Sequence, residues 1–226
     1  MKKQMLSRLF AVVCVAALAF GLTACGSDKR AVESAAKTFM TYCDDGDFAS
    51  AQKMCSSSAA SSLDIDRIDD TFEDRVYSAF SSEGIQKSDL SPSTQNAIDD
   101  LLKYVKKSVI KSYEINDDYD DDTKSLTVKV TMLSDFDSSA YNTAVSNLGN
   151  TYVRQHQSEL MSTYASGGEK ALMVKILDGI MPDAVKQAKT KMVDTATTQD
   201  YTWKLTFEKN SSGDWIVKRA QETKVK

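Results

Sequence analysis

The residues best suited to chemistry in this chain are four cysteines and a single histidine, His156. One histidine cannot form a metal site alone, and no cysteine lies near it in the sequence. A Gly-x-Ser-x-Gly nucleophile elbow, a phosphate-binding loop and a Cys-x-x-Cys pair are all absent. The sequence therefore favours a structural or exposed role for His156, and we expect neither catalytic residues nor metal ligands.

An acidic run from Asp117 to Asp122 is the second candidate for ligand chemistry. Carboxylate oxygens suit calcium, but a helix–loop–helix calcium site needs Asp at alternate positions, a glycine at the sixth position and a glutamate at the twelfth. This run lacks that spacing. We therefore expect a solvated hairpin tip here, without a bound metal.

The N-terminus has the pattern of an export signal, in which three basic residues precede an apolar stretch over residues 9–22. That stretch is about 14 residues long, shorter than the ~20 that a spanning helix needs. The following segment, Leu22-Thr23-Ala24-Cys25, resembles the lipobox of bacterial lipoproteins. The resemblance implies cleavage after Ala24 and a covalent diacylglycerol on Cys25, which would anchor the chain to the extracytoplasmic face of the cell membrane. No other cofactor is expected.

The lipobox divides the chain into a signal peptide (residues 1–24), a short tether (25–29) and a single domain (30–226). The signal peptide carries three basic residues and no acidic ones, so the net charge of −4 becomes −7 in the mature part. An acidic domain without a basic cluster argues against nucleic-acid binding. The tether spans on the order of 15 Å at most, so Lys29 and Arg30 would face the headgroups first. The expected partners are the membrane, through the anchor, and an unidentified envelope ligand or protein.

Two thiols, Cys43 and Cys55, remain in the mature domain besides Cys25. The expected compartment is oxidising, which allows a disulfide. A bridge would close a loop of about a dozen residues, worth ~3 kcal/mol in the chain-entropy model. The two positions fall on successive predicted helices with an axial offset of roughly 6 Å, which disfavours a bridge between strictly antiparallel helices. A disulfide and a pair of buried apolar thiols both remain open.

Hydrophobic periodicity predicts an α+β fold in which helices pack on one face of an antiparallel sheet. A long helical insertion over about residues 138–194, broken near Gly167 and Gly168, separates the predicted strands. Helices are predicted at 29–43, 48–60, 66–81 and 94–105, and strands at 109–116, 126–132, 201–208 and 214–218.

Four aromatic residues gather in the predicted C-terminal hairpin: Tyr201, Trp203, Phe207 and Trp215. Three of them alternate with polar residues along one strand, so they share one face of the sheet. They could line a binding pocket, or they could form the core face of the sheet.

Several motifs resemble small secreted lipoproteins of the nuclear-transport-factor-2-like, cystatin-like superfamily, and more narrowly uncharacterised Gram-positive lipoprotein families within it. These motifs are an opening helix with Phe39, the Gly46-Asp47-Phe48 turn, a second helix that begins FASAQKM, and the closing Gly213-to-Val217 segment, GDWIV. The resemblance implies a curved sheet that helices wrap into a cone, often with a pocket at its open end. The insertion over about 138–194 departs from that minimal fold.

The resemblance does not carry over a reaction, because the superfamily contains both enzymes and binding modules. Acidic residues cluster at turns and helix ends in this sequence, and no predicted strand has an acid on its apolar face. We therefore expect a non-catalytic, membrane-anchored module of the cell envelope that binds a ligand or a partner. The alternative is an isomerase-like or dehydratase-like enzyme of the same fold, with a buried Asp as base and a Tyr as oxyanion donor.

Overall fold

The structure is a computed structural model that describes residues 27–226, apart from the side chains of residues 27, 66, 67, 69–72 and 75. Cys25 of the predicted lipobox and the predicted signal peptide lie outside the described residues, so lipidation stays a prediction. Within residues 27–226, no helix is both long enough and apolar enough to cross a membrane.

The fold is α+β, as predicted, and its four strands form one antiparallel sheet in the order β1-β2-β3-β4. The elements in chain order are α2 (Ser27–Asp44), α3 (Phe48–Lys53), α4 (Ser57–Ser62), α5 (Ile65–Ser82), the 3-10 turn η1 (Lys87–Asp89), α6 (Pro92–Ser108), β1 (Ile110–Ile115), β2 (Ser125–Leu133), α7 (Ser139–Gln155), α8 (Gln157–Ala188), the π-helix η2 (Lys189–Val193), β3 (Thr198–Lys209) and β4 (Trp215–Lys224).

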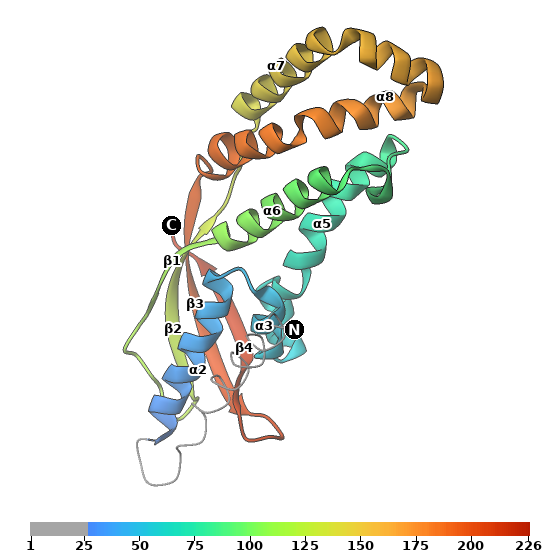
Figure 1. The fold of residues 1–226 in the computed structure, drawn as a ribbon. Coiled ribbons are helices and arrows are strands. Elements are labelled where there is room, and N and C mark those ends of the chain that lie inside the picture. Colours follow the sequence, from blue (N-terminus) through green and yellow to red (C-terminus); the bar gives the residue numbers. More distant parts are fainter. Residues whose placement is uncertain (1–26) are drawn as a thin grey trace, which may run out of the picture.

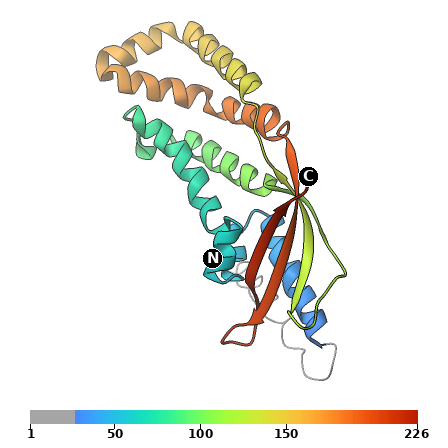
Figure 2. The same ribbon diagram turned by 180° about the vertical axis from the view of Figure 1, so that it is seen from behind.

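The sheet has one apolar face and one polar face because its central strands alternate in the predicted way. Val128 pairs with Trp203 and Lys129 with Thr202, so neighbours across the strands share a face. Val128 and Trp203 are buried, whereas Lys129 is exposed. The polar face is free of helices among the described residues, and Figure 2 shows the strands from that side.

Helix α2 covers the apolar face through residues spaced three and four apart, which fall on one side of a helix. These residues are fully buried: Val32, Ala36, Phe39, Met40 and Cys43. They pack in one cluster with the inward residues of β2, β3 and β4. Full burial of each large apolar side chain contributes about 1.5–3 kcal/mol, so this stripe sets the position of α2 on the sheet.

The turn between α2 and α3 follows the predicted Gly46-Asp47-Phe48 pattern. Gly46 has a φ of +72°, a left-handed conformation that glycine adopts without steric cost. Asp47 caps α3, and its carboxylate accepts a hydrogen bond from the backbone N–H of Ser50 at 3.0 Å. Phe48 then enters the core.

The prediction of one helix over 48–60 is wrong, because the chain leaves the helix between α3 and α4. The N–H of Val217 donates to the carbonyl of Met54 at 2.8 Å, and the N–H of Ser56 donates to the carbonyl of Val217 at 2.8 Å. This segment therefore pairs with β4 in place of forming helical hydrogen bonds. The Ser56 hydroxyl then caps α4 by accepting from the N–H of Ala59 at 3.2 Å.

Helices α5, α6, α8 and α7 form a second layer that extends beyond one end of the sheet (Figure 1). This layer has its own buried cluster, in which Ile98 and Leu102 of α6 pack with Met173 and Leu177 of α8. The carboxylate of Asp178 joins the two helices by accepting from the hydroxyl of Thr94 at 2.6 Å and from the N–H of Ser91 at 3.0 Å.

The predicted helical insertion is present between β2 and β3, but it has more breaks than expected. Gly168 departs from helical geometry (φ 70°, ψ −162°) where the break was predicted. A second break occurs at His156, which ends α7 and precedes α8. The π-helix η2 then leads from α8 to the segment before β3. Figure 1 shows α7 and the later part of α8 side by side as an antiparallel pair.

Candidate functional site

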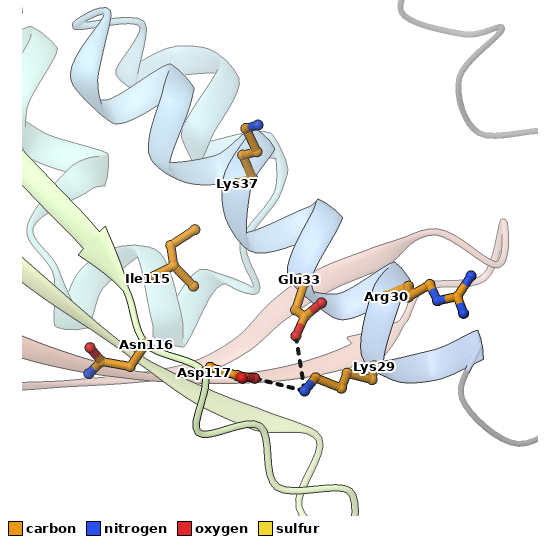
Figure 3. Close-up of a pocket in the computed structure, with 7 residues that line it drawn as sticks. All are labelled: Lys29, Arg30, Glu33, Lys37, Ile115, Asn116 and Asp117. Atoms are coloured by element: carbon orange, nitrogen blue, oxygen red, sulfur yellow. Dashed lines mark hydrogen bonds and ion pairs between the residues drawn. The ribbon is translucent and has the colours of Figure 1, made fainter.

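A hollow in the described surface lies between α2 and the end of β1, and we call it the α2–β1 groove. Its volume is about 740 Å³. Figure 3 shows the lining residues, four from α2 and three from the end of β1 and the residues after it. They are Lys29, Arg30, Glu33, Lys37, Ile115, Asn116 and Asp117.

Charged residues on one side of α2 form the first wall of this groove. Lys29, Glu33 and Lys37 are four residues apart, so they follow one side of α2. Val32 and Ala36 lie between them in the sequence and are fully buried against the sheet. The charged stripe therefore runs beside the core-facing stripe, along the boundary between helix and sheet.

The end of β1 forms the opposite wall. Ile115 is half-buried and packs against the sheet core. Asn116 is held to β2 because its N–H donates to the carbonyl of Thr127 at 3.0 Å and its side-chain amide donates to the Thr127 hydroxyl at 2.7 Å. This double contact fixes the point at which the chain leaves the strand for the acidic loop.

A salt bridge joins the two walls at one end of the groove (Figure 3). The Nζ of Lys29 lies 2.7 Å from Oδ1 of Asp117 and 3.6 Å from Oε1 of Glu33. The hydrogen bond from Lys29 lowers the pKa of Asp117, and the same bond raises the pKa of Lys29. Both groups are exposed, so the pair contributes little to the free energy of unfolding.

Two cations of the groove have no such partner. Neither Arg30 nor Lys37 makes an ion pair within the part of the chain that the structure describes. They are seven residues apart on α2, which is about 10 Å along a helix axis. In Figure 3 the side chain of Lys37 points away from Ile115, and that of Arg30 points away from Asp117.

The groove lies beside an edge of the sheet, because β1 pairs with β2 on one side only. Asn116 bonds toward β2, and hydrogen-bonding direction alternates along an antiparallel strand. The register, with Glu114 opposite Lys129, then directs the N–H and C=O groups of Tyr113 and Ile115 away from β2. Among residues 27–226, no backbone group pairs with this edge.

The two thiols expected in the mature domain are close in the structure, and both are free. Cys43 is fully buried, and Cys55 is half-buried against the same cluster. Burial raises the pKa of the Cys43 thiol, to which the charge of Cys55 adds, and burial raises the pKa of Cys55 to about 12. Whether the oxidised protein forms the disulfide stays one of the two alternatives that the sequence leaves open.

The four aromatic residues of the C-terminal hairpin lie in the sheet core. Trp203 and Phe207 are buried, and Tyr201 and Trp215 pack against the same cluster half-buried. None of them lines the α2–β1 groove. Their alternation on β3 and the return of β4 turn them toward α2 and its neighbours, which is the core-face alternative that the sequence left open.

His156 and the acidic loop both occupy surface positions. The imidazole of His156 stacks on Tyr152 with ring centroids 4.3 Å apart, and its Nδ1 lies 3.2 Å from Oε2 of Glu159. In the loop, the carboxylate of Asp118 accepts from the N–H of Thr127 at 2.9 Å. No group of three or more metal-ligating side chains was found among the described residues.

Tyrosine–aspartate contacts, the pairing that the enzyme alternative needs, occur at exposed positions. The hydroxyl of Tyr104 donates to Asp194 at 2.5 Å, and the hydroxyl of Tyr119 donates to Asp121 at 3.1 Å. Asp194 follows η2, and Tyr119 and Asp121 lie in the loop between β1 and β2. The buried polar side chains that the structure describes are hydroxyl groups, on Thr94, Ser108 and Ser125.

The sequence singled out Lys29 and Arg30, but as residues that face the membrane. It did not identify Lys37 or the turn from Ile115 to Asp117 as parts of one site. The four-residue spacing of charges on α2 is the signal that was available. Comparison with protein-family models, with curated protein sequences and with solved structures finds no match.

Proposed function

We propose that this protein is a lipid-anchored, extracytoplasmic binding module of the cell envelope, which holds a ligand or partner in the α2–β1 groove. The observation that carries the proposal is the position of the groove. Its wall begins at Lys29, four residues after the cysteine of the lipobox. A ligand bound there would be held close to the membrane, at the opposite end of the sheet from the helical layer (Figure 1).

The character of the groove supports binding to a macromolecule. Six of its seven lining residues are charged or polar, and they lie on an open surface between a helix and a strand edge. Small-molecule sites are mostly apolar and enclose most of the ligand. A charged, open groove fits a macromolecular ligand better.

The finer architecture implied by the resemblance, a sheet closed by helices into a cone, belongs to the same proposal. It is supported by α2, which covers the apolar face of the sheet, and by the pairing of the α3–α4 connection with β4. In such an arrangement the groove would lie along the rim, between the first helix and the first strand.

Two measurements test the proposal. Metabolic labelling with a radioactive fatty acid should label the wild-type protein, and Cys25→Ser should abolish the label and release the protein from the membrane fraction. Hydrogen exchange of the mature protein with solubilised envelope material should show protection at residues 29–37 and 113–117, with residues 139–155 as the internal control. A Cys25→Ser protein that still fractionates with membranes would refute the anchor. If the envelope material slows exchange at residues 29–37 and 113–117 no more than at residues 139–155, the binding site is refuted.

A further inference from the structure

We propose that Cys43 and Cys55 form a disulfide bond in the oxidised protein, which fastens helix α2 to the segment that pairs with β4. The inference rests on the proposed function for its compartment, because an extracytoplasmic domain is exposed to oxidants that act on thiols. Three observations carry it: the position of Cys55 outside any helix, the shared surroundings of the two thiols, and the small number of cysteines in the mature chain.

The break between α3 and α4 removes the geometric objection to a bridge. The axial offset of roughly 6 Å follows from placing Cys55 inside one continuous helix over residues 48–60. In the structure α3 ends before Cys55, which lies beside Val217 in a short parallel pairing with β4. The residues on either side of Cys55 make backbone hydrogen bonds to Val217. The sheet therefore sets the position of Cys55, and the helical offset does not apply to it.

The two thiols lie in one part of the hydrophobic core. Cys43 is fully buried in the last turn of α2, and Cys55 packs half-buried against the same cluster. The charge of Cys55 raises the pKa of Cys43 more than the charge of Asp44 does, although Asp44 is the next residue in the chain. Because electrostatic effects weaken with distance, this order indicates that the two sulfur atoms are near neighbours.

No other thiol of the mature chain competes for this pairing. The sequence contains four cysteines, of which Cys14 lies in the predicted signal peptide and Cys25 carries the predicted lipid. An intramolecular bond can therefore join only Cys43 and Cys55. It encloses the Gly46 turn and α3 in a loop of about a dozen residues, and a loop of this length closes at a small entropic cost.

The bond forms by two thiol–disulfide exchanges with a disulfide oxidant. The Cys55 thiolate attacks one sulfur of the oxidant, which gives a mixed disulfide and releases a thiolate that takes up the proton from Cys55. The Cys43 thiolate then attacks the Cys55 sulfur and releases the second thiolate, which takes up the proton from Cys43. Two protein thiols are thereby oxidised, and the oxidant is reduced to two thiols. Cys55 reacts first because it is half-buried, whereas Cys43 is fully buried.

Burial determines when these exchanges take place. It raises the pKa of both thiols, that of Cys55 to about 12, so the folded protein contains little of the reactive thiolate. Exchange is therefore fast in the unfolded chain and slow once the core has closed. We expect the bond to form during folding and to resist reductants in the native protein.

The test refolds the mature lipoprotein from urea into detergent micelles that contain reduced and oxidised glutathione. Trypsin cleaves after Lys37, Lys53 and Arg67, so the two cysteines fall in separate peptides, 38–53 and 54–67. After acid quenching and alkylation, mass spectrometry of the monomeric protein should find these peptides joined, and reduction should separate them. Alkylation of both cysteines, or a glutathione adduct on each, would overturn the proposal.

Urea unfolding gives a second measurement with matched variants. Reductant should lower the urea midpoint of the wild type by about 1 M or more. Cys43→Ala and Cys55→Ala each lack one thiol of the pair, so reductant should leave their midpoints unchanged. A wild-type midpoint that does not respond to reductant would contradict the bond. Refolding needs neither the membrane nor the export pathway, so a failure here is distinct from a failure of fatty-acid labelling at Cys25.

Discussion

Replacing Gly46 by alanine should destabilise the protein far more than the same change at Gly84. Both glycines have the same left-handed backbone, with φ of +72° and +74°. They differ in their surroundings, because a Cβ on Gly46 would lie 2.6 Å from the backbone N of Lys107 and 2.7 Å from the carbonyl carbon of Lys106. A Cβ on Gly84 meets nothing within 4 Å. Comparing the two variants therefore separates the destabilisation caused by contact with α6 from that caused by the left-handed backbone.

The expected loss in the free energy of unfolding has two contributions, one from the left-handed backbone and one from the contact with α6. Alanine in a left-handed conformation costs about 1–2 kcal/mol, and reduced freedom of the unfolded chain returns about 0.4–1 kcal/mol of that. We expect a net loss of about 0–1.6 kcal/mol for Gly84→Ala. At position 46 the new methyl group must also push the backbone of α6 away from the α2–α3 turn. Overpacking of this kind costs about 1–3 kcal/mol more.

The assay is urea unfolding of the wild type and both variants, with the slope of the transition recorded as well as its midpoint. A loss for Gly46→Ala that exceeds the loss for Gly84→Ala by at least about 1 kcal/mol supports the close contact between the turn and α6. If the two losses agree within about 0.5 kcal/mol at equal slopes, the packing of α6 on this turn is not as described.

Three further outcomes are expected. Asp178→Ala should lower the free energy of unfolding by about 1–3 kcal/mol, because it leaves a buried threonine hydroxyl without its acceptor; Asp183→Ala on the same helix, which loses only an exposed pair, should change it by less than about 0.5 kcal/mol in urea unfolding. In an NMR titration the pKa of Asp117 should lie below its ordinary value of 3.8 and rise in Lys29→Met. Because the folded pKa is lowered, the pair stabilises the protein above pH 3.8 and loses this effect as the pH falls through the folded pKa; an unchanged pKa in the variant would contradict the salt bridge. In the reduced native protein at pH 8, Cys55 should react with iodoacetamide roughly a thousandfold more slowly than a free cysteine, because its pKa is about 12. The labelling rate is measured by mass spectrometry, and a rate equal to that of the urea-unfolded chain would contradict the burial of Cys55.

The parts of the fold that follow local periodicity could be predicted from the sequence. The alternation on β2 and β3 and the helical stripe from Val32 to Cys43 both have a period that belongs to one secondary structure, and both are confirmed. The break between α3 and α4 could not be predicted in this way. It depends on two hydrogen bonds, in which the carbonyl of Met54 accepts from the N–H of Val217 and the N–H of Ser56 donates to the carbonyl of Val217, more than 160 residues away in the sequence.

The candidate site could not be predicted from the sequence for the same reason. Its walls come from residues 29–37 and 115–117, and neither segment carries a motif of its own. A charge on an exposed helix face is normally only solvated, so Lys37 became notable only when β1 was placed beside it. The aromatic residues of the hairpin illustrate the converse: alternation placed them on one face, but it could not decide between a core and a pocket.

The way the helical insertion joins the sheet has a mechanical consequence. Its two ends run directly into the central strands β2 and β3, and they are tied together where the N–H of Ser134 donates to the carbonyl of Thr197 and the N–H of Thr197 donates to the carbonyl of Asp135, both at 3.0 Å. From this narrow stem, the portion of α8 after Gly168 reaches about 30 Å. A tilt of about ten degrees at the stem would move the far tip by about 5 Å. Because α8 packs on α6 in a shared buried cluster, such a tilt requires the contact between these two helices to shift as well.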